Sequence, residues 1–325
     1  MKNKGFLLVP VLLLAVLCLG GCAMPGAGGG KSDEVHIAIQ PSAAFIPLYV
    51  AKEKGWIEEA LEPMGVKVTW NSFESGPPMN ESLLSGDSDI GVIGDVPTVM
   101  VAAPDNDVEV IAIAAQAADS YAILVPADSD IQGAADLKGK RVATTFGSTG
   151  HNMAQKYLNT AGLTIDDIEL VNIAAGDAAS VLSKNQAEAV SIWEPNVTRL
   201  TADGSVRILV SGSECGLAGT NAIVARSKFA AASPEVITAI LGQYKRAADA
   251  IPDLDMNTVF AVAKALNVTG EQMDQIIPKF KYTVEITEAD MAALNDTIAF
   301  LNENQILRVD YDIKESANGS YYKGY

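Results

Sequence analysis

The chain has 325 residues, of which 49% are hydrophobic and 6% aromatic, and its formal net charge is −17. So acidic a surface repels phosphate backbones and anionic headgroups, which argues against nucleic acid or an anionic membrane surface as a partner. With two histidines and three cysteines, a transition-metal site is not expected, and we expect no cofactor.

Residues 1–21 have the three regions of a bacterial secretion signal: two lysines, the apolar run 6–19, and small residues before Cys22. The apolar run is too short to span a bilayer. Leu-Gly-Gly before Cys22 resembles the bacterial lipobox, whose cysteine carries a diacylglyceryl group. We therefore expect lipidation of Cys22 and an extracytoplasmic protein anchored to the bacterial cell membrane; an ordinary secreted protein or an uncleaved anchor helix is the alternative. Residues 22–32 are typical of a flexible tether.

From residue 33 onward, short β-branched runs alternate with helical stretches. This alternation predicts a largely parallel sheet covered by helices. The first series is expected to have strands 35–40, 66–73, 89–93 and 108–115, and helices 47–54, 77–84 and 96–103.

A second series follows with the same alternation. Its expected strands are 121–125, 141–145, 169–173, 189–193 and 206–210, and its expected helices are 150–161, 178–184 and 196–201. After a returning strand at 222–225 we expect four helices, at 234–251, 257–266, 271–280 and 288–304.

The last four helices bring no new strands, so we expect them to pack on the first sheet. Lobe 1 would then comprise 33–118 plus 222–325, and lobe 2 would comprise 121–219. Two α/β lobes joined by a two-segment hinge, near residues 119 and 220, indicate a clamshell that closes on a ligand. This arrangement resembles the type II plan of periplasmic binding proteins, and we expect a monomer.

In such sheets, ligands gather beyond the carboxyl ends of the strands, where helix N-termini point their free amides. Four segments lie at such places: Gln40–Pro47, Gly94–Pro97, Phe146–His151 and Trp193–Pro195. Each has a structural alternative. Ser148, Thr149 and Asp95 are also suited to cap helices, His151 to a surface position, and Trp193 to the core.

Three stretches resemble the taurine, alkanesulfonate and nitrate receptors of ABC importers. They are Phe73–Pro97, with Leu-Leu-Ser-Gly-Asp-Ser-Asp-Ile-Gly; Gly147–Leu163, with Gly-Ser-Thr-Gly-His-Asn and Ala-Gly-Leu; and Trp193-Glu194-Pro195. The resemblance extends from about 35 to 307 and is nearest to the taurine-binding branch. It implies delivery of a small anionic or zwitterionic solute to an ABC permease in the cytoplasmic membrane. It also implies an anionic head held by Gly94, Ser148 and Thr149, in a cleft shaped by Gln40, Phe45 and Trp193.

Asp95 and Glu194 depart from the pattern of sulfonate receptors, and with His151 they complete the candidate ligand-binding residues. A carboxylate within about 4 Å of a sulfonate costs on the order of a few kcal/mol at an intermediate dielectric. Either these side chains point away from the ligand, or they meet a cation. We therefore hypothesise a zwitterionic or amine-bearing ligand, taurine first, with Asp95 or Glu194 near its ammonium.

Other functions remain open. A lipoprotein that senses a ligand without transport, or a receptor for nitrate, another small organic acid or an amine, would have the same fold. A relative of this fold makes a thiamine pyrimidine precursor in fungi at a cysteine-rich iron site. Since Cys215 is the single cysteine after Cys22, we expect a binding protein and not an enzyme.

Overall fold

The structure is a computed structural model that describes residues 32–322 and residue 324. The expected signal peptide, Cys22 and all but the last residue of the expected tether lie outside the described residues. Within residues 32–322, no helix has the length and apolar character needed to cross a membrane.

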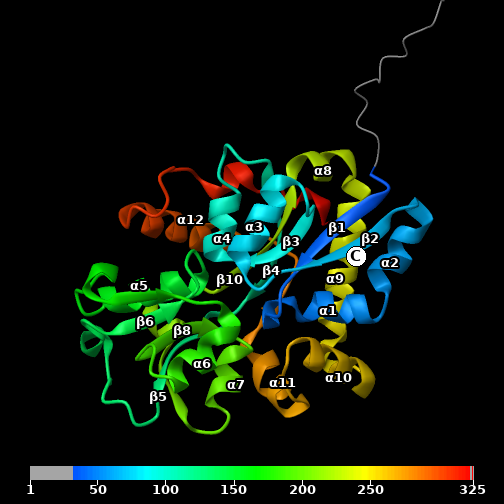
Figure 1. Ribbon diagram of the computed structural model, residues 1–325. Helices are drawn as coiled ribbons and strands as arrows, with labels where there is room; N and C mark the ends of the chain where they lie inside the picture. Colours follow the sequence, from blue (N-terminus) through cyan, green and yellow to red (C-terminus); the bar gives the residue numbers. More distant parts are fainter. Residues whose placement is uncertain (1–31, 323, 325) are drawn as a thin grey trace, which may run out of the picture. The chain divides into compact units, whose positions relative to one another are not determined.

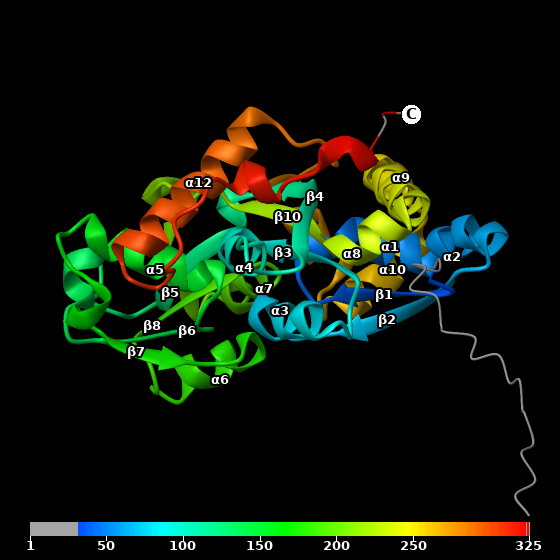
Figure 2. The same cartoon turned by 90° about the horizontal axis from the view of Figure 1, so that it is seen from above.

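The strands form two sheets, each covered by helices (Figures 1 and 2). One sheet has the order β11-β4-β10-β3-β1-β2, and the other has the order β7-β6-β8-β5-β9. The strands of the first are β1 Glu34–Ile39, β2 Lys67–Ser72, β3 Ile90–Gly94, β4 Val108–Gln116, β10 Thr220–Arg226 and β11 Lys281–Tyr282. Those of the second are β5 Tyr121–Pro126, β6 Arg141–Thr144, β7 Glu169–Asn172, β8 Ala189–Trp193 and β9 Val206–Ser211.

Two separate hydrophobic cores define the lobes. Lobe 1 buries side chains from residues 35–114 and 222–321, and lobe 2 buries side chains from residues 121–217. The helices of lobe 1 are α1 Ile46–Glu53, α2 Trp56–Leu61, α3 Gly76–Ser85, α4 Asp95–Val101, α8 Ser227–Ala232, α9 Pro234–Ala250, α10 Met256–Ala265, α11 Gly270–Ile276 and α12 Glu288–Glu303. Those of lobe 2 are α5 Thr149–Asn159, α6 Ala178–Ser183 and α7 Asn196–Thr201.

Both sheets are mixed, so the expectation of largely parallel sheets needs correction. β10 runs antiparallel between β3 and β4, and β5 runs antiparallel between β8 and β9. Each of these two strands follows a crossing between the lobes. Each therefore starts at the end of its sheet where its neighbouring strands finish. The amino-terminal ends of β5 and β10 therefore lie beside the carboxyl ends of β8 and β3.

The two crossings lie next to each other. Gln116 at the end of β4 pairs with Thr220 at the start of β10, and the Ala117 N–H donates to the Gly219 carbonyl at 3.0 Å. Gly219 has φ +66°, and a Cβ there would lie 2.5 Å from the Ala117 carbonyl carbon. Because of both constraints, glycine is required where the chain returns to lobe 1.

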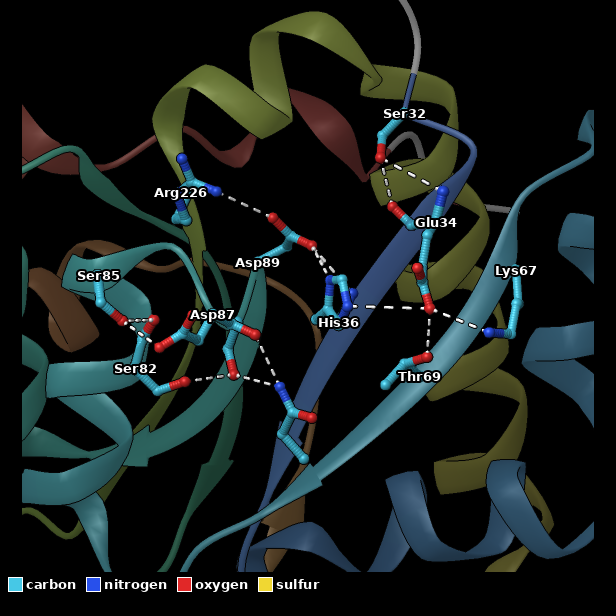
Figure 3. A network of polar contacts seen from close by, with 12 residues as sticks. Ser32, Glu34, His36, Lys67, Thr69, Ser82, Ser85, Asp87, Asp89 and Arg226 are labelled. Atoms are coloured by element: carbon cyan, nitrogen blue, oxygen red, sulfur yellow. Dashed lines mark hydrogen bonds and ion pairs between the residues drawn. The ribbon is translucent and has the colours of Figure 1, made fainter.

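A polar network joins the lobe 1 strands at the start of β1, the start of β3 and the end of β10 (Figure 3). The Asp89 carboxylate, before β3, accepts from the His36 N–H on β1 at 2.9 Å and pairs with Arg226 on β10 at 3.2 Å. Glu34 on β1 accepts from the Thr69 hydroxyl on β2 at 2.5 Å. These contacts hold the strands in register, and the other ends of β1 and β3 carry residues of the candidate site.

Candidate functional site

A cleft lies between the lobes at the carboxyl ends of β1, β3 and β8. Its free volume is about 20 Å³, which is room for about one water molecule. We therefore expect a larger ligand to enter when the lobes move apart. The lining comes from both lobes: Gln40, Ser42, Gly76, Gly94, Pro97 and Asn221 from lobe 1, and Tyr121, Ser148, Thr149 and Trp193 from lobe 2.

None of these lining side chains is charged at neutral pH. The one ionisable group is the Tyr121 phenol, and burial raises its pKa, so it stays neutral. Among the residues that the structure describes, no three metal-ligating side chains gather at one place. The described lining therefore offers dipoles and hydrogen bonds to a ligand, and no counter-charge.

Lobe 2 presents the N-terminus of α5, an 11-residue helix, to the cleft. Ser148 caps it: the Ser148 hydroxyl accepts from the His151 N–H at 3.3 Å and donates to the Thr145 carbonyl at 2.6 Å. The Asn152 N–H bonds to the Ser148 carbonyl. Because the first N–H groups of a helix have no partner within it, those of Thr149 and Gly150 remain to bind an anion, and the helix dipole favours one there.

Two cross-strand pairs complete the cleft. Asn221 pairs with Gly94, and Tyr121 pairs with Trp193, while the Tyr121 hydroxyl donates to the Asn221 side-chain carbonyl at 3.4 Å. A Cβ on Gly94 would overlap the Thr149 hydroxyl oxygen and would lie 3.4 Å from the Tyr121 hydroxyl. Glycine at position 94 therefore lets the two lobes approach this closely.

Asp95 lies outside the cleft lining and joins the lobes. Its buried carboxylate accepts from the Thr149 hydroxyl at 2.5 Å, the Thr297 hydroxyl of α12 at 3.3 Å and the Asn152 amide at 3.4 Å. Burial raises the pKa of this carboxyl, and the hydrogen-bond donors oppose that rise. On the same side, the Lys156 ammonium of α5 lies over the Phe300 ring of α12, 4.8 Å from its centroid, where the two helices are neighbours (Figure 2).

Glu194 also lies outside the cleft lining, and its carboxylate does meet a cation, that of Lys279. Glu194 belongs to lobe 2 and is 0% exposed, while Lys279, in a 3-10 turn before β11 of lobe 1, is 27% exposed. The carboxylate also accepts from the Thr198 N–H at 3.0 Å and hydroxyl at 2.8 Å. The carboxylates of Asp95 and Glu194 thus have protein partners, and neither residue lines the cleft.

The structure brings Gln40, Gly94, Ser148, Thr149 and Trp193 of the sequence-based candidates together in the cleft lining. Phe45 and His151 lie outside it. Phe45 is fully buried in the core of lobe 1. The His151 ring stacks on Phe146 with centroids 5.5 Å apart, its Nδ1 accepts from the Gly147 N–H at 3.3 Å, and burial lowers its pKa.

The sequence reasoning missed five lining residues as individual candidates. Ser42 and Pro97 lie inside segments that it did propose. Tyr121 and Asn221 lie at the starts of the crossing strands, where a rule based on strand ends does not look. Gly76 begins α3, and a Cβ there would lie 2.6 Å from the Pro97 ring. Gly76 also lies in the Phe73–Pro97 stretch that carries the resemblance, and two prolines follow it.

A family model described as NMT1/THI5 like matches residues 42–253. The chain belongs to this family. It is 30% identical to the putative aliphatic sulfonates-binding protein of Bacillus subtilis (strain 168), over 96% of this chain and 95% of that protein. It is 28% identical to the taurine-binding periplasmic protein of Escherichia coli (strain K12), over 84% of this chain and 87% of that protein.

Among solved structures, the fold is similar to that of the alkanesulfonate-binding protein SsuA from Xanthomonas axonopodis pv. citri bound to MOPS. The TM-score is 0.81 at 24% identity, and the match covers 89% of this chain and 99% of that chain. This likeness confirms the two-lobed α/β fold class for this member of the NMT1/THI5-like family.

Proposed function

We propose that the protein captures a small organosulfonate in the interlobe cleft and delivers it to the permease of an ABC importer. The observation that carries this proposal is the described cleft lining, which is uncharged and receives the N-terminus of α5. Relatives that bind taurine or aliphatic sulfonates, by their names, support the same ligand class.

A sulfonate suits this lining for electrostatic reasons. It keeps its negative charge throughout the physiological pH range, and its three oxygens accept several hydrogen bonds from N–H and O–H groups. A helix N-terminus contributes up to about 2 kcal/mol to an anion in a favourable, partly buried position. The carboxylates that would repel a sulfonate, Asp95 and Glu194, lie outside the lining: Asp95 accepts from the Thr149 hydroxyl, and Glu194 is paired with Lys279.

We propose binding without catalysis, because relatives of this chain are named as binding proteins. The Thr149 hydroxyl of the lining donates to the Asp95 carboxylate, which also accepts from Thr297 and Asn152. Cys215 lies in the turn after β9, its thiol donates to the Gly212 carbonyl at 3.3 Å, and burial raises the pKa of that thiol. A thiol with a raised pKa is a poor nucleophile at neutral pH.

The proposed role also requires a location next to a permease. We propose that the mature chain starts at Cys22, carries a lipid there, and acts as a monomer on the outer side of the cytoplasmic membrane. The relatives named as periplasmic support an extracytoplasmic location. The tether 22–32 would let the lobes reach the permease while the lipid stays in the bilayer.

A thermal-shift screen tests the ligand class, with ethanesulfonate, taurine, nitrate, propionate and ethylamine as probes. A ligand at 100 times its dissociation constant stabilises the folded state by about 2.7 kcal/mol, so the melting temperature rises by several degrees. We expect at least one sulfonate to do this and ethylamine not to. If propionate or ethylamine raises the melting temperature and neither sulfonate does, the proposed function is wrong.

A further inference from the structure

Gln40 lines the cleft and carries a buried acceptor without a partner. It follows β1 and lines the cleft, and it is 7% exposed. Its side-chain oxygen, Oε1, has no hydrogen-bond partner among the described residues. By contrast, other polar groups of the cleft lining already have protein partners: the hydroxyls of Tyr121 and Thr149 and the amide of Asn221.

A buried acceptor that leaves water and finds no donor is costly, and a ligand that supplies the donor removes that cost. The oxygens of a sulfonate are acceptors, so they cannot satisfy Gln40 Oε1. The cleft is thus two-sided: lobe 2 offers the donors of the α5 N-terminus, and lobe 1 offers an acceptor. A ligand that matches both sides carries an anionic head and a separate N–H or O–H group.

We propose that Gln40 accepts a hydrogen bond from an amino or hydroxyl group of the ligand. The cleft then selects short sulfonates with such a substituent over plain alkanesulfonates. This inference rests on the proposed function and moves recognition of the ammonium from Asp95 or Glu194 to Gln40. A neutral carbonyl suits this role, because a carboxylate at position 40 would also repel the sulfonate a few ångströms away.

Three ligands of nearly equal length separate the possibilities: taurine, with an ammonium; isethionate, with a hydroxyl; and ethanesulfonate, with neither. Calorimetric titration of the mature chain gives the dissociation constant for each. A hydrogen bond to a charged group predicts that taurine binds about 10- to 100-fold more tightly than ethanesulfonate. Isethionate should lie between them, because its donor is neutral.

Two substitutions of Gln40 then test the residue. Gln40→Met keeps the length and removes the acceptor, so the preference for taurine over ethanesulfonate should fall to within about threefold. Gln40→Glu keeps an acceptor and adds charge, so ethanesulfonate should weaken more than taurine and the preference should grow. Gln132→Met, on an exposed loop of lobe 2, is the control and should change none of the three constants.

The outcomes separate this inference from the proposed function. If none of the three sulfonates binds the wild type, the proposed function fails. If all three bind it equally, sulfonate capture stands and the role of Gln40 is wrong, because water or no group at all meets its oxygen. If Gln40→Met weakens taurine and ethanesulfonate by the same factor, the Gln40 amide donates to the sulfonate, and the inference is also wrong.

Discussion

Gly94→Ala tests whether the close approach of the lobes closes the cleft on its ligand. Gly94 has φ −70° and ψ 174°, values that alanine adopts without strain. The cost of the substitution therefore comes from the new methyl group alone. In the closed state that methyl group overlaps the Thr149 hydroxyl oxygen from the other lobe.

Two responses relieve the overlap, and both weaken the closed state. Either the lobes separate, or Thr149 rotates and gives up its 2.5 Å hydrogen bond to Asp95. A hydrogen bond to a charged group is worth about 1.5–3 kcal/mol, which corresponds to about 10- to 100-fold in affinity. With the lobes apart the methyl group has no such neighbour, so the substitution should leave the open state unperturbed.

The assay combines calorimetric titration of taurine with thermal unfolding of the ligand-free protein. Gly176→Ala, where a Cβ meets nothing within 4 Å, is the matched control and should bind taurine like the wild type. The reasoning is refuted if Gly94→Ala binds with unchanged affinity. It is also refuted if the ligand-free variant melts far below the wild type, because the methyl group would then disturb lobe 1 itself.

Three further changes follow from the contacts between the lobes and from the amino terminus. Lys279→Met leaves the buried Glu194 carboxylate without its cation, which should cost about 3 kcal/mol and lower the melting temperature by about 6–12 °C. Adding Glu194→Gln should recover most of this loss. If the double variant shows no recovery, the ion pair is contradicted. Asp95→Asn removes a buried acid whose folded-state pKa is raised. As pH rises from about 4 to that folded-state pKa, the wild type's free energy of unfolding should therefore fall relative to the variant's. A difference that stays flat in urea unfolding from pH 4 to 8 would count against this. Cys22→Ala should release the protein from the membrane, so that it partitions into the aqueous phase of a detergent extraction and binds taurine with unchanged affinity. A fall in affinity would contradict the separation of anchor and cleft.

The sequence predicted the long elements of the fold well, because periodicity needs length to be visible. The helices α9 and α12, with 17 and 16 residues, begin at the expected residues. The six-residue helices α2 and α8 and the two-residue strand β11 were not expected. The equally short helices α6 and α7 were expected, because each lies between two predicted strands of an alternating series. β11 forms because β4 offers it an edge, and nothing within two residues encodes that edge.

The candidate site was predictable where one strand and the following loop determine it. Gln40 directly follows β1, Gly94 ends β3, and Ser148 lies in the loop between β6 and α5, so the rule for carboxyl ends of strands finds all three. The roles of Asp95 and Glu194 were not predictable in this way. Their partners Thr297 and Lys279 lie 202 and 85 residues away along the chain, so the local sequence shows the carboxylates but not what neutralises or solvates them.

The antiparallel position of β10 also sets an order in which the molecule can be completed. Lobe 2 is a continuous stretch from β5 to β9, whereas lobe 1 receives the strand between β3 and β4 only after lobe 2 has been made. A chain that emerges amino end first can therefore fold lobe 2 while lobe 1 is unfinished. Until β10 arrives, β3 and β4 each have an unpaired edge, on which other chains can add. Lobe 1 is thus the half that needs protection from aggregation during synthesis.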